Sequence, residues 1–326
     1  MLEITDQSDN NLDKNHLDKL REIRLRPVFI LGLNRSGTSI LYKMLVETDC
    51  FNPVTIYHIV FYNQLLYNHI NGLEQKIKEE FADFLIKNEL TNRGIDRLKL
   101  NIDFAEEYGF LLGKITFVKK IKAKNIDNFV QLCKKIVYLS ENNKPILLKN
   151  PMDFSNFLFI KDVFPNAKFI FIHRNPINVL SSTISALKKL FEKRKALPKN
   201  IFKYYTIVFD YKILLKTIRF FLSYLFPIIP LIIIFYTKIT LNYYLKNIGK
   251  LSEKDYVRLT YEDLCKNPQK NMNKIINFLD LEVKENINFS EFIKPRKTKI
   301  DPAIFHMRKF IYRCMKRYFK KFNYKP

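Results

Sequence analysis

One short loop near the start of the chain has the residue types needed to hold an anion. It runs from Gly32 to Ser39 (GLNRSGTS), between an apolar segment and a helical pattern. Backbone N–H groups at the start of a helix carry partial positive charge and favour an anion. The glycines allow close approach, Thr38 and Ser39 offer hydroxyl groups, and Arg35 offers a planar cation. The loop predicts a phosphate-binding site; the alternative is a tight turn whose glycines only satisfy backbone geometry.

This loop departs from the phosphate-binding pattern G-x-x-x-x-G-K-[ST], because Thr38 stands at the lysine position. Its basic residue, Arg35, comes three positions earlier. The ligand is therefore expected to be a phosphate compound that needs no lysine at the second position of the helix.

A second segment, HRNPINVLSS, also combines a basic residue with a hydroxyl group. His173 and Arg174 end an apolar run, and Pro176 suits the first turn of a helix. Ser182 lies eight residues after Arg174, two helical turns on, where it could approach the same anion. Taken alone, the segment also fits an ordinary capped helix.

The elements that must position these residues alternate between strands and helices. Short apolar runs predict strands at Pro27–Leu33, Pro145–Leu148, Lys168–Ile172 and Asp255–Thr260. Helical patterns follow the first, third and fourth of these runs. The order predicts an α/β fold, a P-loop-like and mostly parallel sheet flanked by helices, with helical insertions. Arg35, Lys149 and Arg174 each follow a strand and should converge on one edge of the sheet.

We divide the chain into three segments on this basis. Residues 1–25 are a polar N-terminal extension, and residues 301–326 a basic amphipathic helix. The main domain spans 26–300, with insertions at about 57–143 and 195–254 that are expected to shape the pocket of an acceptor.

The composition of the chain limits which partners it is expected to bind and in which cellular compartment it is expected to lie. The 326 residues carry a net charge of +24, which favours anionic ligands or surfaces but decides nothing alone. No pattern typical of nucleic-acid binding is present, so no nucleic-acid partner is expected. The four cysteines form no CxxC pair, and the polar N-terminus is no signal peptide. A cytoplasmic protein without a metal site is expected, with peripheral attachment to a membrane as an option.

Four segments together resemble the sulfotransferase superfamily. They are LGLNRSGTSIL, ILLKNPMDFSNFLFIKDVFPNAKFIFIHR with its continuation NPINVLSS, and LTYEDLCKNPQKNMNKIINFLDLE. The resemblance runs in order from about Pro27 to Leu281, and is weak at 63–143 and 195–254. Asn34 replaces the family's usual proline and Ser39 its commoner second threonine, and neither change removes a donor.

The resemblance implies that 3′-phosphoadenosine 5′-phosphosulfate (PAPS) is the sulfuryl donor, with no metal required. The loop would hold its 5′-phosphosulfate, Arg174 and Ser182 its 3′-phosphate, and Tyr261 would lie near its adenine. Lys149 and Arg35 would neutralise charge on the transferring group; a solvated lysine at a strand end is the alternative for Lys149. The implied donor-binding residues are Arg35, Ser36, Gly37, Thr38, Ser39, Arg174, Ser182, Tyr261 and Lys294.

The resemblance implies that the general base is a His or Glu some two dozen residues after the loop. His58 lies at that distance and could deprotonate a hydroxyl near neutral pH, although a packed histidine is the alternative. Glu106 and Glu107 are the next candidates. Lys294 belongs to a short basic segment (FIKPRK) that could close over the nucleotide.

Two segments have membrane-like features. Phe220–Thr237 is uncharged but is interrupted by Pro227 and Pro230, so we weigh a buried segment, an interfacial element and a membrane span. In the C-terminal segment, Ile304, Ile311, Met315, Tyr318 and Phe322 recur at helical spacing among Lys and Arg residues. Such a helix can lie on an anionic bilayer, and a packing helix with a solvated basic face fits equally well.

The sequence therefore predicts a PAPS-dependent sulfotransferase acting on a hydroxyl or amine group of an acceptor such as a glycan or lipid. One alternative is a nucleotide-dependent phosphotransferase, disfavoured by the missing lysine. Another is a degenerate relative that binds nucleotide or membrane without catalysis.

Overall fold

The computed structural model describes most of the chain in two compact units. The described residues are 11–87, 101–116, 119–192, 228–283, 286–293 and 299–325. Within them, the first unit comprises residues up to 27 and from 49 to 148, and the second comprises 28–48 and the parts from 149 onward. The predicted membrane-like run Phe220–Thr237 falls partly, and Lys294 wholly, outside the described residues.

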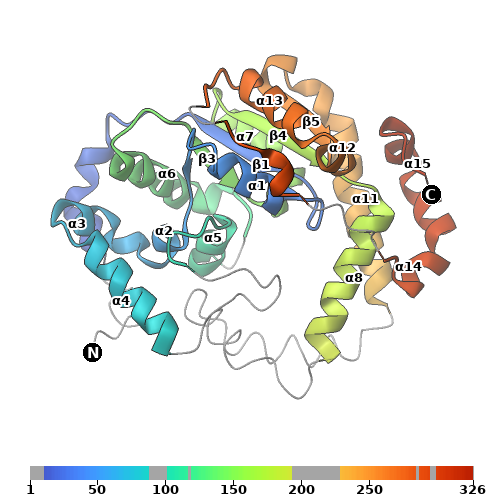
Figure 1. Ribbon diagram of the computed structural model, residues 1–326, viewed down its shortest axis with the longest axis horizontal. Helices are drawn as coiled ribbons and strands as arrows, with labels where there is room; N and C mark the ends of the chain where they lie inside the picture. The colour runs from blue at the N-terminus through green and yellow to red at the C-terminus, as the bar shows by residue number, and fades with distance from the viewer. Residues whose placement is uncertain are drawn as a thin grey trace. The chain divides into compact units, whose positions relative to one another are not determined.

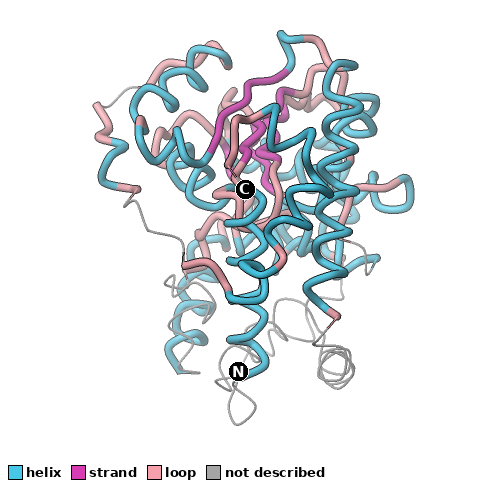
Figure 2. Tube along the Cα trace, turned by 90° about the vertical axis from the view of Figure 1, so that its right-hand side faces the viewer, coloured by secondary structure: helices cyan, strands magenta, loops and turns pink. Residues whose placement is uncertain are grey.

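The second unit is built on three parallel strands. Strand β4 (Lys168–His173) lies between β1 (Pro27–Leu31) and β5 (Tyr256–Thr260) (Figure 1). Figure 2 shows the strands in magenta and the helices in cyan. Val28 is opposite Lys168, and Phe169 is opposite Tyr256. The interior residues of β1 and β4 are almost completely buried, as expected when helices cover both faces of a parallel sheet.

Helices complete the second unit. Helix α11 packs against both α8 and α15, and α12 and α13 pack on β5. The helices are α1 (Thr38–Val46), α7 (Phe157–Val163), α8 (Pro176–Glu192), α11 (Ile229–Asn247), α12 (Tyr261–Lys266), α13 (Pro268–Phe278), α14 (Pro302–His306) and α15 (Arg308–Lys321).

The starts of these helices are fixed by local chemistry. The Asn175 side chain accepts the Ile177 N–H at 2.9 Å, and Pro176 occupies the first helical position of α8. The Thr260 hydroxyl caps α12 in the same way, accepting the Asp263 N–H at 3.2 Å. Both caps follow directly on strands, so the helices begin where β4 and β5 end.

The first unit is mostly helical. Its strand pair, β2 (Asn52–Pro53) and β3 (Ile146–Lys149), is parallel. Its helices are α2 (Ile56–Val60), α3 (Leu65–Ile70), α4 (Glu74–Lys87), α5 (Gly109–Thr116) and α6 (Ile126–Ser140). The 57–143 insertion is thus helical in its described residues, as predicted. The predicted fold class is confirmed, with parallel strands flanked by helices.

A buried ion pair joins the N-terminal segment to the rest of the first unit. Residues Leu12–Leu20 form a 3₁₀ helix that packs on α3 and α6. The Lys135 ammonium lies 2.8 Å from the Asp13 carboxylate and also donates to the Tyr62 carbonyl at 2.7 Å. The Tyr67 N–H donates to the other carboxylate oxygen. The sequence predicted a polar extension over residues 1–25. In the structure, Leu12–Leu20 of this segment pack into the core of the first unit.

The C-terminal segment forms two helices, α14 and α15, instead of the single helix predicted. Its apolar stripe, including Ile311, Met315 and Tyr318, is buried. The stripe therefore packs within the second unit, and lysine and arginine residues lie on the exposed side of α15. Among the described residues, no helix has the length and apolar character to cross a membrane.

Asp13→Asn should lower the free energy of unfolding by about 3–5 kcal/mol, because it leaves the Lys135 ammonium buried without its carboxylate. Urea denaturation measures the change. The control is Asp18→Asn, which breaks the exposed pair with Arg21, whose side chains are 78% and 76% exposed. The control should cost less than about 1 kcal/mol. Equal losses in the two variants would contradict a structural role for the buried pair.

Candidate active site

The loop between β1 and α1 makes a tight turn at the carboxyl end of the sheet. Arg35 and Gly37 both have positive φ, at 68° and 102°. The Ser36 N–H donates to the Leu33 carbonyl at 3.0 Å, which closes the turn. The first turn of α1 follows at once, so its unpaired N–H groups lie beside the side chains of the loop.

The two glycines of the loop are required by close packing. A Cβ atom on Gly32 would lie 2.5 Å from the Ile172 carbonyl oxygen. A Cβ atom on Gly37 would overlap the ring of Tyr261, at the start of α12. The loop is therefore held against the ends of β4 and β5, and only glycine permits this approach.

Two arginines, a serine and a tyrosine meet beside this loop. The Arg35 Nε donates to the Ser182 hydroxyl at 3.1 Å, and the Arg174 Nη1 donates to the Arg35 carbonyl at 2.8 Å. The Arg174 guanidinium lies 4.3 Å from the centre of the Tyr261 ring. The structure thus brings together the predicted residues, but Ser182 contacts Arg35, whereas the sequence had associated it with Arg174.

Lys149 lies at the other end of the loop. Its ammonium donates to the Ser39 hydroxyl at 3.0 Å and lies 5.6 Å from the centre of the Tyr42 ring. The residue is only 3% exposed, so the solvated lysine considered above is not what the structure contains. A buried ammonium at the first turn of α1 adds to the positive potential there.

A network of amides and one carboxylate fixes the turn after Lys149. The Asn150 side chain accepts the Met152 N–H and donates to the Asp153 carboxylate at 2.8 Å. The Asn156 amide donates to the other Asp153 oxygen at 2.9 Å. Asp153 is completely buried, so these bonds are strong and directional. The N-P-x-D spacing was a signal for this capped turn that the sequence reasoning passed over.

The donors of the site suit a polyanion. The Ser36 hydroxyl is buried and has no hydrogen-bond partner in the described part of the chain. Buried hydroxyl groups are normally satisfied, so this one points to a ligand. Around it are backbone N–H groups, the hydroxyls of Thr38 and Ser39 and the cations of Arg35, Arg174 and Lys149. Such a set fits phosphate and sulfate oxygens.

His173, which precedes Arg174, is a core residue. Its Nδ1 lies 2.8 Å from the Tyr318 hydroxyl, and its ring packs against Tyr244 and Phe322. Burial, followed by the charges of Arg258 and Lys321, holds the pKa of His173 well below its usual 6.5. The imidazole is therefore neutral and serves to join β4 to α15.

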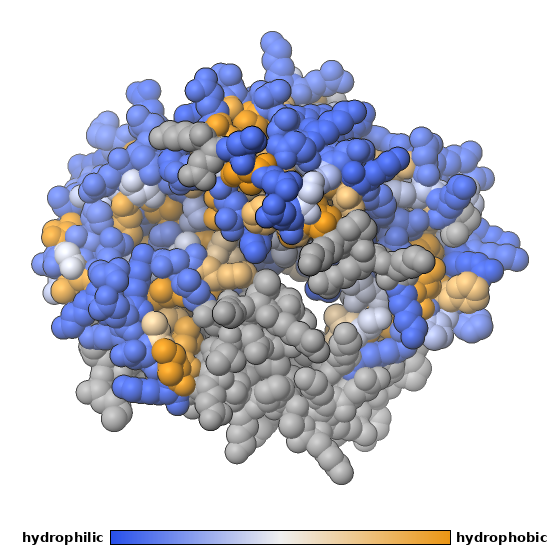
Figure 3. Space-filling view, viewed as in Figure 1, coloured by the Kyte–Doolittle hydropathy of each residue, from blue (hydrophilic) through white to orange (hydrophobic). Residues whose placement is uncertain are grey.

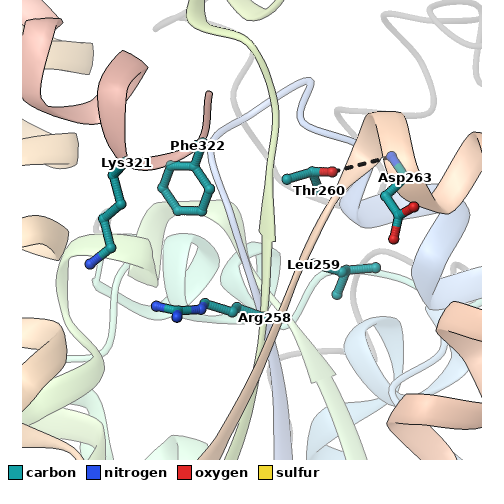
Figure 4. Close-up of a pocket in the computed structure, with 6 residues that line it drawn as sticks. All are labelled: Arg258, Leu259, Thr260, Asp263, Lys321 and Phe322. Carbon is teal, nitrogen blue, oxygen red and sulfur yellow. Dashed lines mark hydrogen bonds between the residues drawn. The ribbon is translucent and has the colours of Figure 1, made fainter. Parts of the chain in front are cut away.

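A cavity of about 390 Å³ opens at the end of β5. Figure 4 shows the cationic groups of Arg258 and Lys321 on the same side of it, and Thr260 and Asp263 at the start of α12. Burial and the Arg258 charge lower the pKa of Lys321. The two cations also account for part of the depressed His173 pKa.

His58, the predicted base, caps a helix of the first unit. Its Nδ1 accepts the Thr55 N–H at 3.0 Å, while the Thr55 hydroxyl accepts the His58 N–H. The ring proton of the neutral form therefore lies on Nε2. Burial and, secondarily, Lys78 lower the pKa of His58 to about 3. The catalytic role of His58 stays a prediction, and a base of this kind would have to release its capping bond.

The alternative bases also belong to the first unit. Glu106 is completely buried, and one of its carboxylate oxygens accepts the Glu107 N–H at 2.9 Å. Glu107 and Glu106 oppose the lowering that burial imposes on the pKa of Lys119. A buried carboxylate beside a lysine is suited to proton transfer, so Glu106 stays a candidate.

Comparisons with known proteins find similar sequences and structures. A family model described as the sulfotransferase family matches residues 27–206. Relatives from Mycobacterium bovis and Mycobacterium tuberculosis, named omega-hydroxy-beta-dihydromenaquinone-9 sulfotransferase Stf3, are 26% identical over 193 residues, covering 51% of this chain and 46% of theirs. The chain thus matches about half the length of these relatives.

Two solved structures share the fold. The sulfotransferase STF9 from Mycobacterium avium has a TM-score of 0.60 and 13% identity, covering 99% of this chain and 85% of its own. The sulfotransferase STF1 from Mycobacterium tuberculosis H37Rv has a TM-score of 0.58 and 11% identity, covering 92% and 79%. At these identities the likeness establishes the fold.

Gly37→Ala should lower the free energy of unfolding by about 1–3 kcal/mol more than Gly72→Ala. Both positions have positive φ, but a Cβ atom meets nothing within 4 Å at Gly72 and overlaps the Tyr261 ring at Gly37. Urea denaturation measures the loss in both variants. Gly72→Ala gives the loss caused by a positive φ without an overlap, and the further loss in Gly37→Ala is assigned mainly to the overlap with the ring. Equal losses would show that the ring moves aside freely.

The depressed pKa of His58 predicts a stability that falls with acidification. The unfolded imidazole takes up a proton near pH 6.5 and the folded one only near pH 3, so the contribution is complete above pH 6.5 and is lost below it. His58→Gln, which preserves the capping pattern, should therefore reduce the loss between pH 7.5 and pH 5.0 by about 2 kcal/mol. Urea denaturation at both values measures it, and an unchanged loss would mean that His58 titrates normally.

Proposed function

The chain belongs to the sulfotransferase family, and we propose that it transfers a sulfuryl group from PAPS to a hydroxyl or amine group of an acceptor. One observation carries the proposal. Within the second unit, the loop of Arg35 to Ser39 is bracketed by Lys149 at one end and by Arg174, Ser182 and Tyr261 at the other. PAPS has two anionic groups that could pair with these two clusters, a 5′-phosphosulfate and a 3′-phosphate, joined through an adenosine.

The roles of the residues follow from this match. The loop and the first turn of α1 would hold the 5′-phosphosulfate, where backbone N–H groups and the buried Ser36 hydroxyl are available. Arg174 and Ser182 would hold the 3′-phosphate. The ring of Tyr261, already in contact with Arg174, would lie against the nucleoside.

The chemistry is a displacement at sulfur. The acceptor oxygen or nitrogen forms a bond to sulfur while the bond from sulfur to the bridging phosphate oxygen breaks, and the acceptor proton passes to a base. Negative charge grows on the departing phosphate. Lys149 and Arg35 would neutralise it, so that catalysis rests on position and charge as in phosphoryl transfer. His58, Glu106 and Glu107 are the candidate bases.

The acceptor we propose first is a hydroxyl group carried by a lipid. The relatives from Mycobacterium bovis and Mycobacterium tuberculosis are named for an omega-hydroxylated menaquinone. The match spans about half their length, and a hydroxyl group of a glycan is the alternative class.

The donor site is tested with 3′,5′-adenosine bisphosphate, the product left after transfer. At one hundred times its dissociation constant it should stabilise the protein by about 2.7 kcal/mol, seen as a rise in Tm. Arg174→Ala should weaken binding at least tenfold, because charge-assisted bonds to phosphate are lost. Arg21→Ala, an exposed arginine in the first unit, is the control and should bind normally.

A second variant, Lys149→Met, tests sulfuryl transfer separately from nucleotide binding. It should keep bisphosphate binding within a few fold but reduce transfer from PAPS to a lipid alcohol about 10²–10³-fold. A response to ATP with Mg²⁺ alone would favour the phosphotransferase alternative. Bisphosphate binding without any effect of Lys149→Met would favour a degenerate relative.

A further inference from the structure

Helix α11 exposes an apolar stripe. Ile232 and Ile239 are 54% and 67% exposed, and their neighbours on the same side of the helix are also large, apolar and exposed. The spacing of three or four residues places them in one row. The opposite side of α11 is buried in the second unit. The row comprises Ile228, Leu231, Ile232, Phe235, Tyr236 and Ile239.

The stripe continues onto the neighbouring helices. Phe310 of α15 is exposed, and its ring centre lies 6.2 Å from that of Phe235. Phe305 of α14 is exposed as well. Figure 3 shows apolar and hydrophilic residues side by side over α14 and α15 at the right-hand edge of the view. We call these two phenylalanines and the row on α11 the apolar patch. Contiguous exposed apolar surface of this kind marks an interaction site.

Basic side chains surround the apolar patch. The Arg308 guanidinium lies 4.1 Å from the centre of the Phe305 ring, and the Lys238 ammonium 5.9 Å from that of Phe235. Lys309 and Arg313 are exposed on the outer side of α15. Across residues 228–247 and 299–325 the only acidic residue is Asp301, which is buried and bonded to Lys188.

We propose that the apolar patch rests on an anionic lipid bilayer, with its basic rim against the headgroups. The combination of apolar surface with basic residues and no exposed acid is complementary to such a surface. The apolar stripe of α15 itself is buried, so this helix would contribute charge while α11 contributes apolar contact. The proposal does not depend on the donor site.

The test is sedimentation of the full chain with vesicles. Phosphatidylcholine vesicles containing 30% phosphatidylglycerol are compared with pure phosphatidylcholine. We expect binding to the anionic vesicles that weakens in 0.5 M salt and is at least tenfold weaker to neutral ones. Ile232→Ser with Ile239→Ser should weaken binding to anionic vesicles at least tenfold. Lys309→Gln with Arg313→Gln should weaken it about fivefold for each charge removed.

The control is Ile86→Ser, which removes an even more exposed isoleucine (73%) from α4 of the first unit and should leave binding unchanged. Unchanged Tm and bisphosphate binding in the patch variants show that fold and donor site are intact, which separates this test from that of the function. Failure of the unaltered chain to bind anionic vesicles would overturn the proposal. So would self-association in solution abolished by the same isoleucine variants, since the apolar patch would then join two copies.

Discussion

The close approach of the Tyr261 ring to Gly37 is the constraint on which the proposed donor site depends. It joins the loop after β1 to the helix after β5, and the same ring carries the Arg174 guanidinium from the end of β4. Three segments distant in sequence are thereby held at one edge of a parallel sheet. A side chain at position 37 would separate them, so the conformational freedom of one glycine permits the whole arrangement.

This arrangement concentrates positive charge. Arg35, Arg174 and Lys149 lie around a single loop, and like charges at such range repel one another. The Ser182 and Ser39 hydroxyl groups and the Arg35 carbonyl accept hydrogen bonds from these cations. A polyanionic donor, bound as proposed, would relieve this repulsion and would satisfy the buried Ser36 hydroxyl.

Much of this could be predicted from sequence, because its signals are local. The four predicted strands agree with β1, β3, β4 and β5 to within two residues at each end, and the loop from Gly32 to Ser39 joins a strand to a helix as predicted. Properties that depend on distant packing could not be predicted. Examples are the pairing of Arg35 with Ser182, the burial of the α15 stripe and the exposure of the α11 stripe. The sequence of an apolar stripe does not show whether another element of the fold covers it. His58 was predicted as the general base from its distance in sequence to the loop. Its hydrogen bond with the Thr55 N–H depends on local backbone geometry, which that distance does not reveal.

The neutral His173 has a consequence for how the site responds to its surroundings. It directly precedes Arg174 in the chain, and burial holds the pKa of its imidazole well below the usual 6.5. Arginine side chains stay charged across the physiological pH range. The terminal phosphate of the nucleotide, by contrast, changes its charge near pH 6. If the nucleotide binds as proposed, the pH dependence of its release would come from protonation of its own phosphate. The arginines that face this phosphate would keep the same charge throughout.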